Sequence, residues 1–342
     1  ASAAGLGYYV ESQKDVGDYT YNLALTSADM PTGDGNYSVS LYVRPGRLQI
    51  LPRELTVTTG SGTKTYDGTP LTKDEATITG LVAADEGKVT VTATGSQTKV
   101  GFSDNTYSIV WGTVNSDNYT IKEELGTLNV TEAELTVTIN DIEKVYNGAE
   151  QQGRSFVATV TGTGEAITTD DYTVEGLGSG DVLTIAYTPA KWTNVGEYTG
   201  AFAENYTIVN ANGEDVTGYY KTTTFNEGKL IITPAQLTIT ADSNEKEYDG
   251  TPLTDKGWQD TAPVGLQGTD AVESVTVTGS QTLVGSSNNI ASEAVIKNGD
   301  NVVTNNYNIT YTPGLLKITD KNVDPSLIVT KNDAENDEYK YA

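Results

Sequence analysis

The pentapeptide Lys64-Thr65-Tyr66-Asp67-Gly68 reveals the architecture of the chain, because closely related copies stand at Lys144–Gly148 and Lys246–Gly250. Each copy follows a strand-like Leu-Thr-(Val/Ile)-Thr run by about ten residues, and these runs are Leu55–Thr58, Leu135–Thr138 and Leu237–Thr240. The tyrosines and the leucines keep one register: 80 residues separate the first two copies and 102 separate the next two. Ordered landmarks at such spacing are typical of tandem structural repeats. The sequence therefore predicts an array of similar modules.

Other recurring phrases indicate strands and tight turns. The Leu-Thr runs alternate in the period-two manner of half-buried strands, and Asp-Gly or Asn-Gly favours a two-residue hairpin turn. Each unit closes on Gly-x-Leu-x-(Ile/Val), as at Gly126–Val130, and no segment shows sustained helical periodicity. We expect an all-β chain of small immunoglobulin-like β-sandwich modules. A β-grasp arrangement is the alternative and requires a helix. The motif tyrosines are expected to lie in the core with the hydroxyl on a backbone carbonyl.

The landmarks divide the chain into five segments. They are a partial (second-half) repeat at 1–52, repeat 1 at 53–133, repeat 2 at 134–235, repeat 3 at 236–319, and a connector with the start of a further β domain at 320–342. Only about four residues separate the last strand of one unit from the first strand of the next, which is too short for a flexible tether. We therefore expect an elongated rod. Repeat 2 is the longest, and its extra residues are expected to form a hairpin insertion at 210–227.

Composition excludes several classes of function. The net charge of −25 argues against nucleic acid as a partner. The absence of cysteine and histidine excludes disulfides, thiolate nucleophiles, Ser-His-Asp chemistry and ordinary zinc sites. No apolar run approaches the roughly 20 residues of a membrane span, so no membrane insertion is expected. No cofactor is expected either, although the Asn298–Asn301 cluster leaves calcium open. The termini look like cuts within a longer protein.

The ordered phrases also carry a family resemblance. Leu-Thr-Val-Thr, Lys-x-Tyr-Asp-Gly-Thr-Pro-Leu-Thr, Asn-Tyr-Thr-Ile and Gly-x-Leu-x-Ile-Thr resemble the MBG-type repeats, YGX variety, of large bacterial cell-surface adhesins. The resemblance covers residues 53 to about 319, and 1–52 as a half unit. It implies an extracellular, wall-anchored, repetitive stalk with no catalytic residues, and no ligand site can be carried over from it. Repeat 2 departs from the pattern after Gly148, where Ala-Glu-Gln replaces Thr-Pro-Leu.

Two sets of candidate site residues follow. A Lys–Asn amide cross-link beside a buried carboxyl group could staple each module, since a desolvated lysine is nucleophilic. Acids such as Asp85, Asp171 or Asp270 could assist it. Aromatic residues of the 210–227 hairpin could contact a ligand. The candidate cross-link pairs are Lys64 with Asn118, Lys144 with Asn205, and Lys246 with Asn306, and the candidate ligand contacts are Tyr219, Tyr220 and Phe225.

The leading hypothesis is a non-enzymatic, extracellular stalk or adhesin segment on a bacterial cell surface, which spaces or presents a binding region. One alternative is a module that binds a glycan, a host protein or a neighbouring cell's surface protein through the 210–227 hairpin. Another is a filament subunit that associates head to tail, with residues 320–342 adding strands to the next molecule. An enzyme is not expected, because thin repeated units offer no deep cleft.

Overall fold

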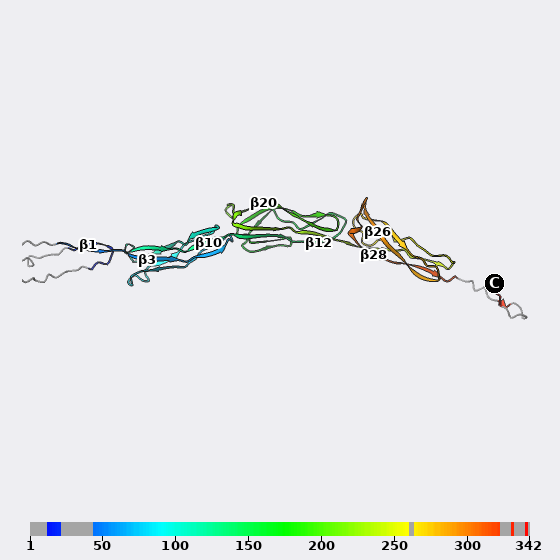
Figure 1. Ribbon diagram of the computed structural model, residues 1–342, viewed down its shortest axis with the longest axis horizontal. Helices are drawn as coiled ribbons and strands as arrows, with labels where there is room; N and C mark the ends of the chain where they lie inside the picture. Colours follow the sequence, from blue (N-terminus) through cyan, green and yellow to red (C-terminus); the bar gives the residue numbers. More distant parts are fainter. Residues whose placement is uncertain (1–11, 22–43, 260–262, 322–329, 332–338, 341–342) are drawn as a thin grey trace, which may run out of the picture.

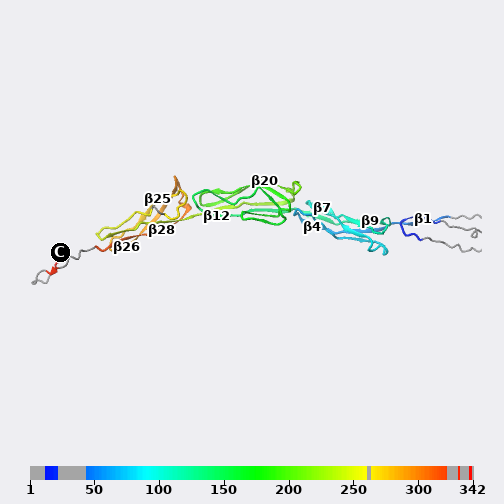
Figure 2. The same cartoon turned by 180° about the vertical axis from the view of Figure 1, so that it is seen from behind.

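The computed structural model describes residues 12–21, 44–259, 263–321, 330–331 and 339–340. Three β modules lie end to end along one axis, as both views of the chain show (Figures 1 and 2). Over these ranges the only helical elements are three short 3-10 turns, η1 (Ser116–Asn118), η2 (Thr217–Tyr219) and η3 (Thr304–Asn306). The prediction of an all-β, elongated array is confirmed. The β-grasp alternative finds no helix in the described part of the chain.

Module 1 follows a short hairpin, β1 (Gly17–Tyr21) and β2 (Gly46–Ile50). Its strands form the sheets β5-β3-β9, β4-β10-β7 and β6-β8. They are β3 (Arg53–Thr59), β4 (Gly62–Thr65), β5 (Ala76–Thr79), β6 (Thr90–Ala93), β7 (Gly101–Asp104), β8 (Tyr107–Val110), β9 (Tyr119–Glu124) and β10 (Thr127–Thr131).

Module 2 is the largest and has the sheets β15-β16-β11-β21, β12-β22-β19, β14-β17-β20 and β13-β18. Its strands are β11 (Ala133–Ile139), β12 (Ile142–Val145), β13 (Gln151–Gln152), β14 (Thr159–Thr161), β15 (Ile167–Thr168), β16 (Tyr172–Glu175), β17 (Val182–Thr188), β18 (Lys191–Trp192), β19 (Gly196–Thr199), β20 (Ala201–Val209), β21 (Tyr220–Asn226) and β22 (Lys229–Thr233).

Module 3 pairs β23 with β28 and forms the sheet β24-β29-β26-β25, to which β27 adds by pairing with β26. Its strands are β23 (Ala235–Thr240), β24 (Asn244–Glu247), β25 (Ala271–Thr278), β26 (Gly285–Asn298), β27 (Asn301–Val302), β28 (Tyr307–Thr312) and β29 (Gly314–Thr319). A separate hairpin, β30 (Thr330–Lys331) and β31 (Tyr339–Lys340), lies within 320–342. The rest of the predicted connector and further β domain, beyond residue 321, falls outside the described residues.

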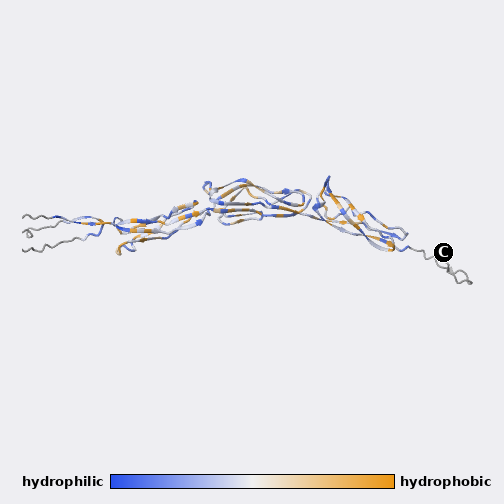
Figure 3. Ribbon diagram, viewed as in Figure 1, coloured by the Kyte–Doolittle hydropathy of each residue, from blue (hydrophilic) through white to orange (hydrophobic). Residues whose placement is uncertain are grey.

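One pairing scheme repeats in all three modules. The first strand runs parallel to the penultimate strand, as β3 does with β9, and the second runs parallel to the last, as β4 does with β10. The predicted sandwich is thus built from mixed sheets rather than purely antiparallel ones. Side chains along a strand alternate between its two faces, and in β3 the face with Leu55 and Val57 is fully buried. Hydrophobic positions lie on strands of all three modules, interspersed with hydrophilic ones (Figure 3).

Successive modules are joined almost without a linker. Only Glu132 separates β10 from β11, and only Pro234 separates β22 from β23. Two residues, Leu51 and Pro52, lie between β2 and β3. A one-residue connection leaves the chain little freedom, because flexible tethers are longer and rich in Gly and Ser.

The 210–227 stretch is not one inserted hairpin. A tight hairpin turn does form at its start, where Val209 pairs antiparallel with Asp215. The rest contains η2 and β21, and β21 pairs in parallel with β11 as β9 does with β3. Module 2 gains most of its extra length earlier. Gly196 follows Tyr146 by 50 positions, whereas the equivalent Gly101 follows Tyr66 by 35, and the longer stretch of module 2 contains β13 to β18. The error came from aligning Asn205-Tyr206 with Asn118-Tyr119, whose structural counterpart is Tyr219-Tyr220.

Candidate functional site: the junctions between modules

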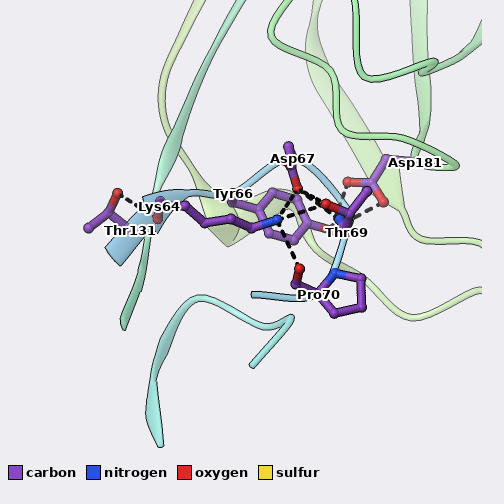
Figure 4. Close-up of polar contacts among 7 residues, drawn as sticks. All are labelled: Lys64, Tyr66, Asp67, Thr69, Pro70, Thr131 and Asp181. Carbon is purple, nitrogen blue, oxygen red and sulfur yellow. Dashed lines mark hydrogen bonds and ion pairs between the residues drawn. The ribbon is translucent and has the colours of Figure 1, made fainter. Parts of the chain in front are cut away.

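The Lys-x-Tyr-Asp-Gly turn is ordered by its own side chains. In module 1 the Lys64 ammonium donates to Asp67 Oδ1 and to Thr69 Oγ1, both at 2.7 Å, and the Thr69 N–H donates to Asp67 Oδ1 at 2.8 Å (Figure 4). Burial raises the pKa of Asp67, but the bonds from Lys64 and Thr69 outweigh it and leave that pKa below its usual value. The turn is thus preorganised with Tyr66 at its tip.

The same network recurs in module 3, at the far end of the array. Lys246 donates to Asp249 at 2.8 Å and to Thr251 at 2.7 Å. The hydrogen bonds that Asp249 accepts from Lys246 and from Thr251 hold its pKa well below the usual value. Gly250 has no described atom within 4 Å of where a Cβ would lie, and Tyr248 is 37% exposed. The turn therefore keeps its internal bonds without a neighbouring module against it.

In module 1 the tip of the turn enters module 2. The Tyr66 hydroxyl donates to Asp181 Oδ2 at 2.9 Å, and the Tyr220 hydroxyl donates to the same oxygen at 2.6 Å. Asp181 is 1% exposed. A buried carboxylate needs such donors because its desolvation is costly. Figure 4 shows Tyr66 reaching from the turn to Asp181. The backbone adds a bond, from Ser179 N–H to the Asp67 carbonyl at 2.7 Å.

The junction between modules 2 and 3 repeats this geometry. The Tyr146 hydroxyl donates to Asp270 Oδ2 at 2.8 Å, and the Tyr307 hydroxyl donates to it at 2.6 Å. Asn298 Nδ2 donates to the other oxygen at 2.6 Å. The rings of Tyr146 and Tyr307 meet edge to face at 5.5 Å, a favoured aromatic geometry. Each junction therefore places a tyrosine of one module on a buried aspartate of the next.

Apolar packing is continuous across both junctions. Tyr66 and Val130 of module 1 belong to the same buried cluster as Leu135 of module 2. Likewise Tyr146 and Ile232 of module 2 pack with the core of module 3. The modules therefore share apolar interior where they meet, so bending a junction would expose buried hydrophobic surface.

A second polar contact lies at the side of two junctions. Asn306, which is 4% exposed, accepts from Val195 N–H and donates to Asn194 Oδ1, both at 2.9 Å. Asn118 makes the same pair of bonds at the start of module 1. It accepts from Val16 N–H at 2.7 Å and donates to Asp15 Oδ1 at 2.8 Å. Tyr219 occupies this position in module 2, and its ring meets that of Tyr66 edge to face at 5.1 Å.

Burial raises the pKa of the tyrosines at the junctions. The pKa of Tyr146 is raised to about 12, first by burial and second by the hydrogen bond to Asp270. Burial and the bond to Asp181 likewise raise the pKa of Tyr66 and of Tyr220, and burial and the bond to Asp270 raise that of Tyr307. All four hydroxyls remain protonated at neutral pH and act as donors to the carboxylates.

Sequence reasoning missed this role of the aspartates, although a sequence signal marks them. Gly-Leu-x-x-x-Asp occurs at Gly80–Asp85, Gly176–Asp181 and Gly265–Asp270. Each glycine has a positive φ, and a Cβ would overlap a backbone carbonyl oxygen of its own module's first strand. The phrase therefore recurs because a glycine is needed to turn the chain beside that strand. Asp171, the acid that the sequence suggested in module 2, instead pairs with Arg154 at 3.0 Å.

The prediction that the motif tyrosines bond a backbone carbonyl is wrong for Tyr66 and Tyr146, because their hydroxyls reach carboxylates of the following module. The cross-link hypothesis also fails to fit the geometry. Lys64 stands beside the junction with module 2, whereas Asn118 contacts residues 15 and 16 at the opposite end of module 1.

The other two candidate pairs are also separated. Lys246 bonds Asp249 and Thr251, while Asn306 bonds module 2. Lys144 donates to the Gln152 carbonyl at 2.8 Å, and Asn205 lies in β20, away from the structural position that Asn118 holds in module 1. The recurring lysine and asparagine thus serve different ends of a module.

The predicted ligand contacts are interior residues. Tyr220 is buried, and Tyr219 and Phe225 are partly buried against the core cluster that includes Tyr66. The surface that Tyr219 and Tyr220 do contact is the turn of module 1. Tyr219 and Tyr220 thus serve the junction, and a ligand contact by the partly buried Phe225 stays a prediction.

The described residues offer neither a cluster of metal ligands nor a membrane-spanning helix. Within them, no three Asp or Glu side chains converge so as to hold an ion. No helix in the described part of the chain is both long and apolar enough to cross a bilayer.

Comparison with known proteins gives one family match. Residues 51–126 match the YDG domain family, whereas no curated protein matches the chain. A glucan-utilisation protein of Bacteroides ovatus, SGBP-B solved with a mixed-linkage heptasaccharide, is 12% identical, with 77% of this chain and 67% of that one covered and a TM-score of 0.14. The I9-I11 tandem of titin is 9% identical, with 80% and 98% covered and a TM-score of 0.19. Neither likeness is close enough to carry an argument. The matched residues fall in module 1, and modules 2 and 3 repeat the parallel strand pairing of module 1.

Proposed function

We propose that this chain is a non-enzymatic, extracellular stalk segment of a bacterial surface adhesin, which holds a binding region at a fixed distance and direction. The main support comes from the junctions between modules. A buried tyrosine–aspartate bond, a shared apolar interior and a one-residue connection occur together at both complete junctions. Such a connection resists bending far more than a flexible linker does.

The acidic surface suits an extended extracellular rod. With a net charge of −25, the array repels itself and other copies, which favours a soluble, extended chain. The YDG match and the resemblance to MBG-type adhesin repeats support a bacterial surface location. No observation favours a ligand-binding role for the 210–227 stretch. The idea that residues 320–342 join molecules into filaments rests on residues that are largely outside the described ranges.

Single-molecule imaging tests the proposal. Negative-stain or rotary-shadowed electron micrographs of the full chain should show rods of one contour with a narrow distribution of angles at both complete junctions. The Asp181→Ala variant should broaden the angle between modules 1 and 2 and leave the other junction unchanged. A wild-type chain that bends freely at both junctions would contradict the stalk role. Antibodies against the modules should label intact bacteria of the source species, and labelling only after lysis would contradict the surface location.

A further inference from the structure

The first and last strands of each module form one parallel pair that runs the length of the module. In module 1, β3 pairs with β9 at six positions, and β4 pairs with β10 at four. Both ladders keep one register: Arg53 lies opposite Tyr119 and Lys64 lies opposite Val130, which is 66 positions further along the chain in each case. Residues 53–65 therefore lie along residues 119–131 in a single register, across two sheets.

Modules 2 and 3 repeat this arrangement, again with six paired positions in the first ladder and four in the second. The partners are 88 positions apart in module 2, as Lys144 and Ile232 are, and 72 positions apart in module 3, as Lys246 and Ile318 are. Only the first pair of module 2, at Ala133, departs from this register, through a bulge. The separation differs between modules because the segment between the two strands differs in length, whereas the number of paired positions stays the same.

Side-chain hydrogen bonds fill the gap between the two ladders. A backbone N–H at the start of the last strand donates to a side chain in the segment that joins the first two strands, and donor and acceptor keep the register of the ladders. These bonds are Thr127 N–H to Ser61 Oγ at 3.0 Å, Lys229 N–H to Asp141 Oδ1 at 2.8 Å, and Leu315 N–H to Ser243 Oγ at 2.9 Å. In module 1 the buried Thr59 hydroxyl also accepts from Gly126 N–H at 2.9 Å. Hydrogen bonds therefore join the two strands from one end of the module to the other.

The chain enters and leaves this pair of strands at opposite ends. In module 1 it enters at Arg53, the start of one strand, and leaves at Thr131, the end of the other. The strands run along the rod, so tension along the rod pulls the two strands past each other (Figure 1). The hydrogen bonds of both ladders then carry the load together. A pull across the pair would instead break them one after another, and a single hydrogen bond is weak.

The Lys-x-Tyr-(Asp/Asn)-Gly turn gives the same load a second route into the next module. Only Glu132 separates β10 from β11, so module 2 must follow β10 when that strand is pulled. The turn that follows β4 is bonded to module 2 through Tyr66 and Asp181. The strand β10 therefore cannot slide away from β4 without also breaking this bond. Tyr146 and Asp270 stand in the same relation between modules 2 and 3.

We propose that each module is a shear clamp that carries tension along the chain, and that the turn tyrosine loads the next module in parallel with the covalent connection. The segment between the paired strands, residues 66–118 in module 1, lies off the path of the load and stays folded until the pair parts. The clamp is inferred from the strand geometry, and its use at a bacterial surface rests on the stalk function proposed above.

Pulling the same module in two directions tests the clamp. The chain has no cysteine, so pairs of introduced cysteines define where DNA handles attach for optical tweezers on the full chain. Glu54→Cys with Glu132→Cys loads the pair of strands in shear. Glu54→Cys with Asp117→Cys peels it, because both sites lie at the end of module 1 where β3 and β9 begin, and all three side chains are exposed. We expect the unfolding force in shear to be several times the force in peeling, and equal forces would overturn the proposal.

The load path through the turn is tested with handles at Glu54→Cys and Gln236→Cys, which place modules 1 and 2 under tension together. At 3.3–3.6 Å per residue, residues 53–131 and 133–233 release roughly 26–28 nm and 33–36 nm of chain, so the length of each step identifies its module. In traces where the module 1 step comes first, Tyr66→Phe should lower its force. Asp181→Ala should lower the same force, although residue 181 lies in module 2.

The length of the module 2 step shows whether that module still folds in the Asp181→Ala variant, and Tyr66→Phe serves alone if it does not. A module 1 force that neither substitution changes would overturn the role of the turn. Stiffness of the unloaded rod is measured separately by microscopy, so equal shear and peeling forces would remove the clamp and leave the stalk function standing. Freely bending rods with a high shear force would instead refute the stalk function alone.

Discussion

Replacing Tyr66 by phenylalanine removes one hydroxyl from the junction between modules 1 and 2 and leaves the ring in place. Asp181, 1% exposed, then loses its donor at 2.9 Å and keeps Tyr220 at 2.6 Å. A hydrogen bond to a charged group contributes about 1.5–3 kcal/mol, so we expect the variant to lose about 2 kcal/mol of unfolding free energy. The loss should appear in the unfolding of module 2, whose core holds Asp181.

The assay is urea denaturation of the full chain followed by circular dichroism and tyrosine fluorescence. Tyr248→Phe is the matched control, because it stands at the same motif position and its hydroxyl makes no hydrogen bond with the described residues. The control should be within about 0.5 kcal/mol of the parent, as for surface substitutions generally. Equal effects of the two substitutions would mean that the tyrosine–aspartate bond contributes nothing to the junction.

Three further predictions address the junctions. Gly68→Ala should lower the denaturant midpoint more than Gly250→Ala. Both glycines have φ near +80°, but only at Gly68 would a Cβ overlap the Ser179 carbonyl. Equal losses would mean that backbone strain alone, and not the contact with module 2, causes the effect. The contribution of the junction tyrosines to stability should be constant from neutral pH to about pH 10 and should fall above it. Their raised pKa values, such as about 12 for Tyr146, mean that the unfolded tyrosines ionise before the folded ones, and unchanged midpoints between pH 9 and 11 would contradict this. Asn306→Ala should cost about 1–3 kcal/mol in module 3 and widen the angle between modules 2 and 3 in micrographs, and an unchanged angle would show that the Tyr146 contact alone sets it.

Local signals in the sequence were enough to predict the modules. Alternating Leu-Thr runs can bury only one face, and Asp-Gly or Asn-Gly turns suit tight reversals, so strands at Leu55–Thr58, Leu135–Thr138 and Leu237–Thr240 followed from these residues. The elongated rod followed from the short connections between units, because a few residues cannot let neighbouring modules fold back on each other. These features depend on neighbours in sequence and require no knowledge of distant contacts.

The junctions were decided by tertiary structure. Tyr66 and Asp181 lie 115 residues apart, and no local pattern shows that a turn tyrosine of one module completes a buried carboxylate in the next. The misplaced insertion in module 2 has the same origin, since Tyr220 is identified as the counterpart of Tyr119 only by its parallel pairing with the first strand. Local sequence determines which residues form turns and which face of each strand is apolar. Which of them meet across a module boundary depends on how two folded surfaces fit, because the two tyrosines that donate to Asp181 come from different modules.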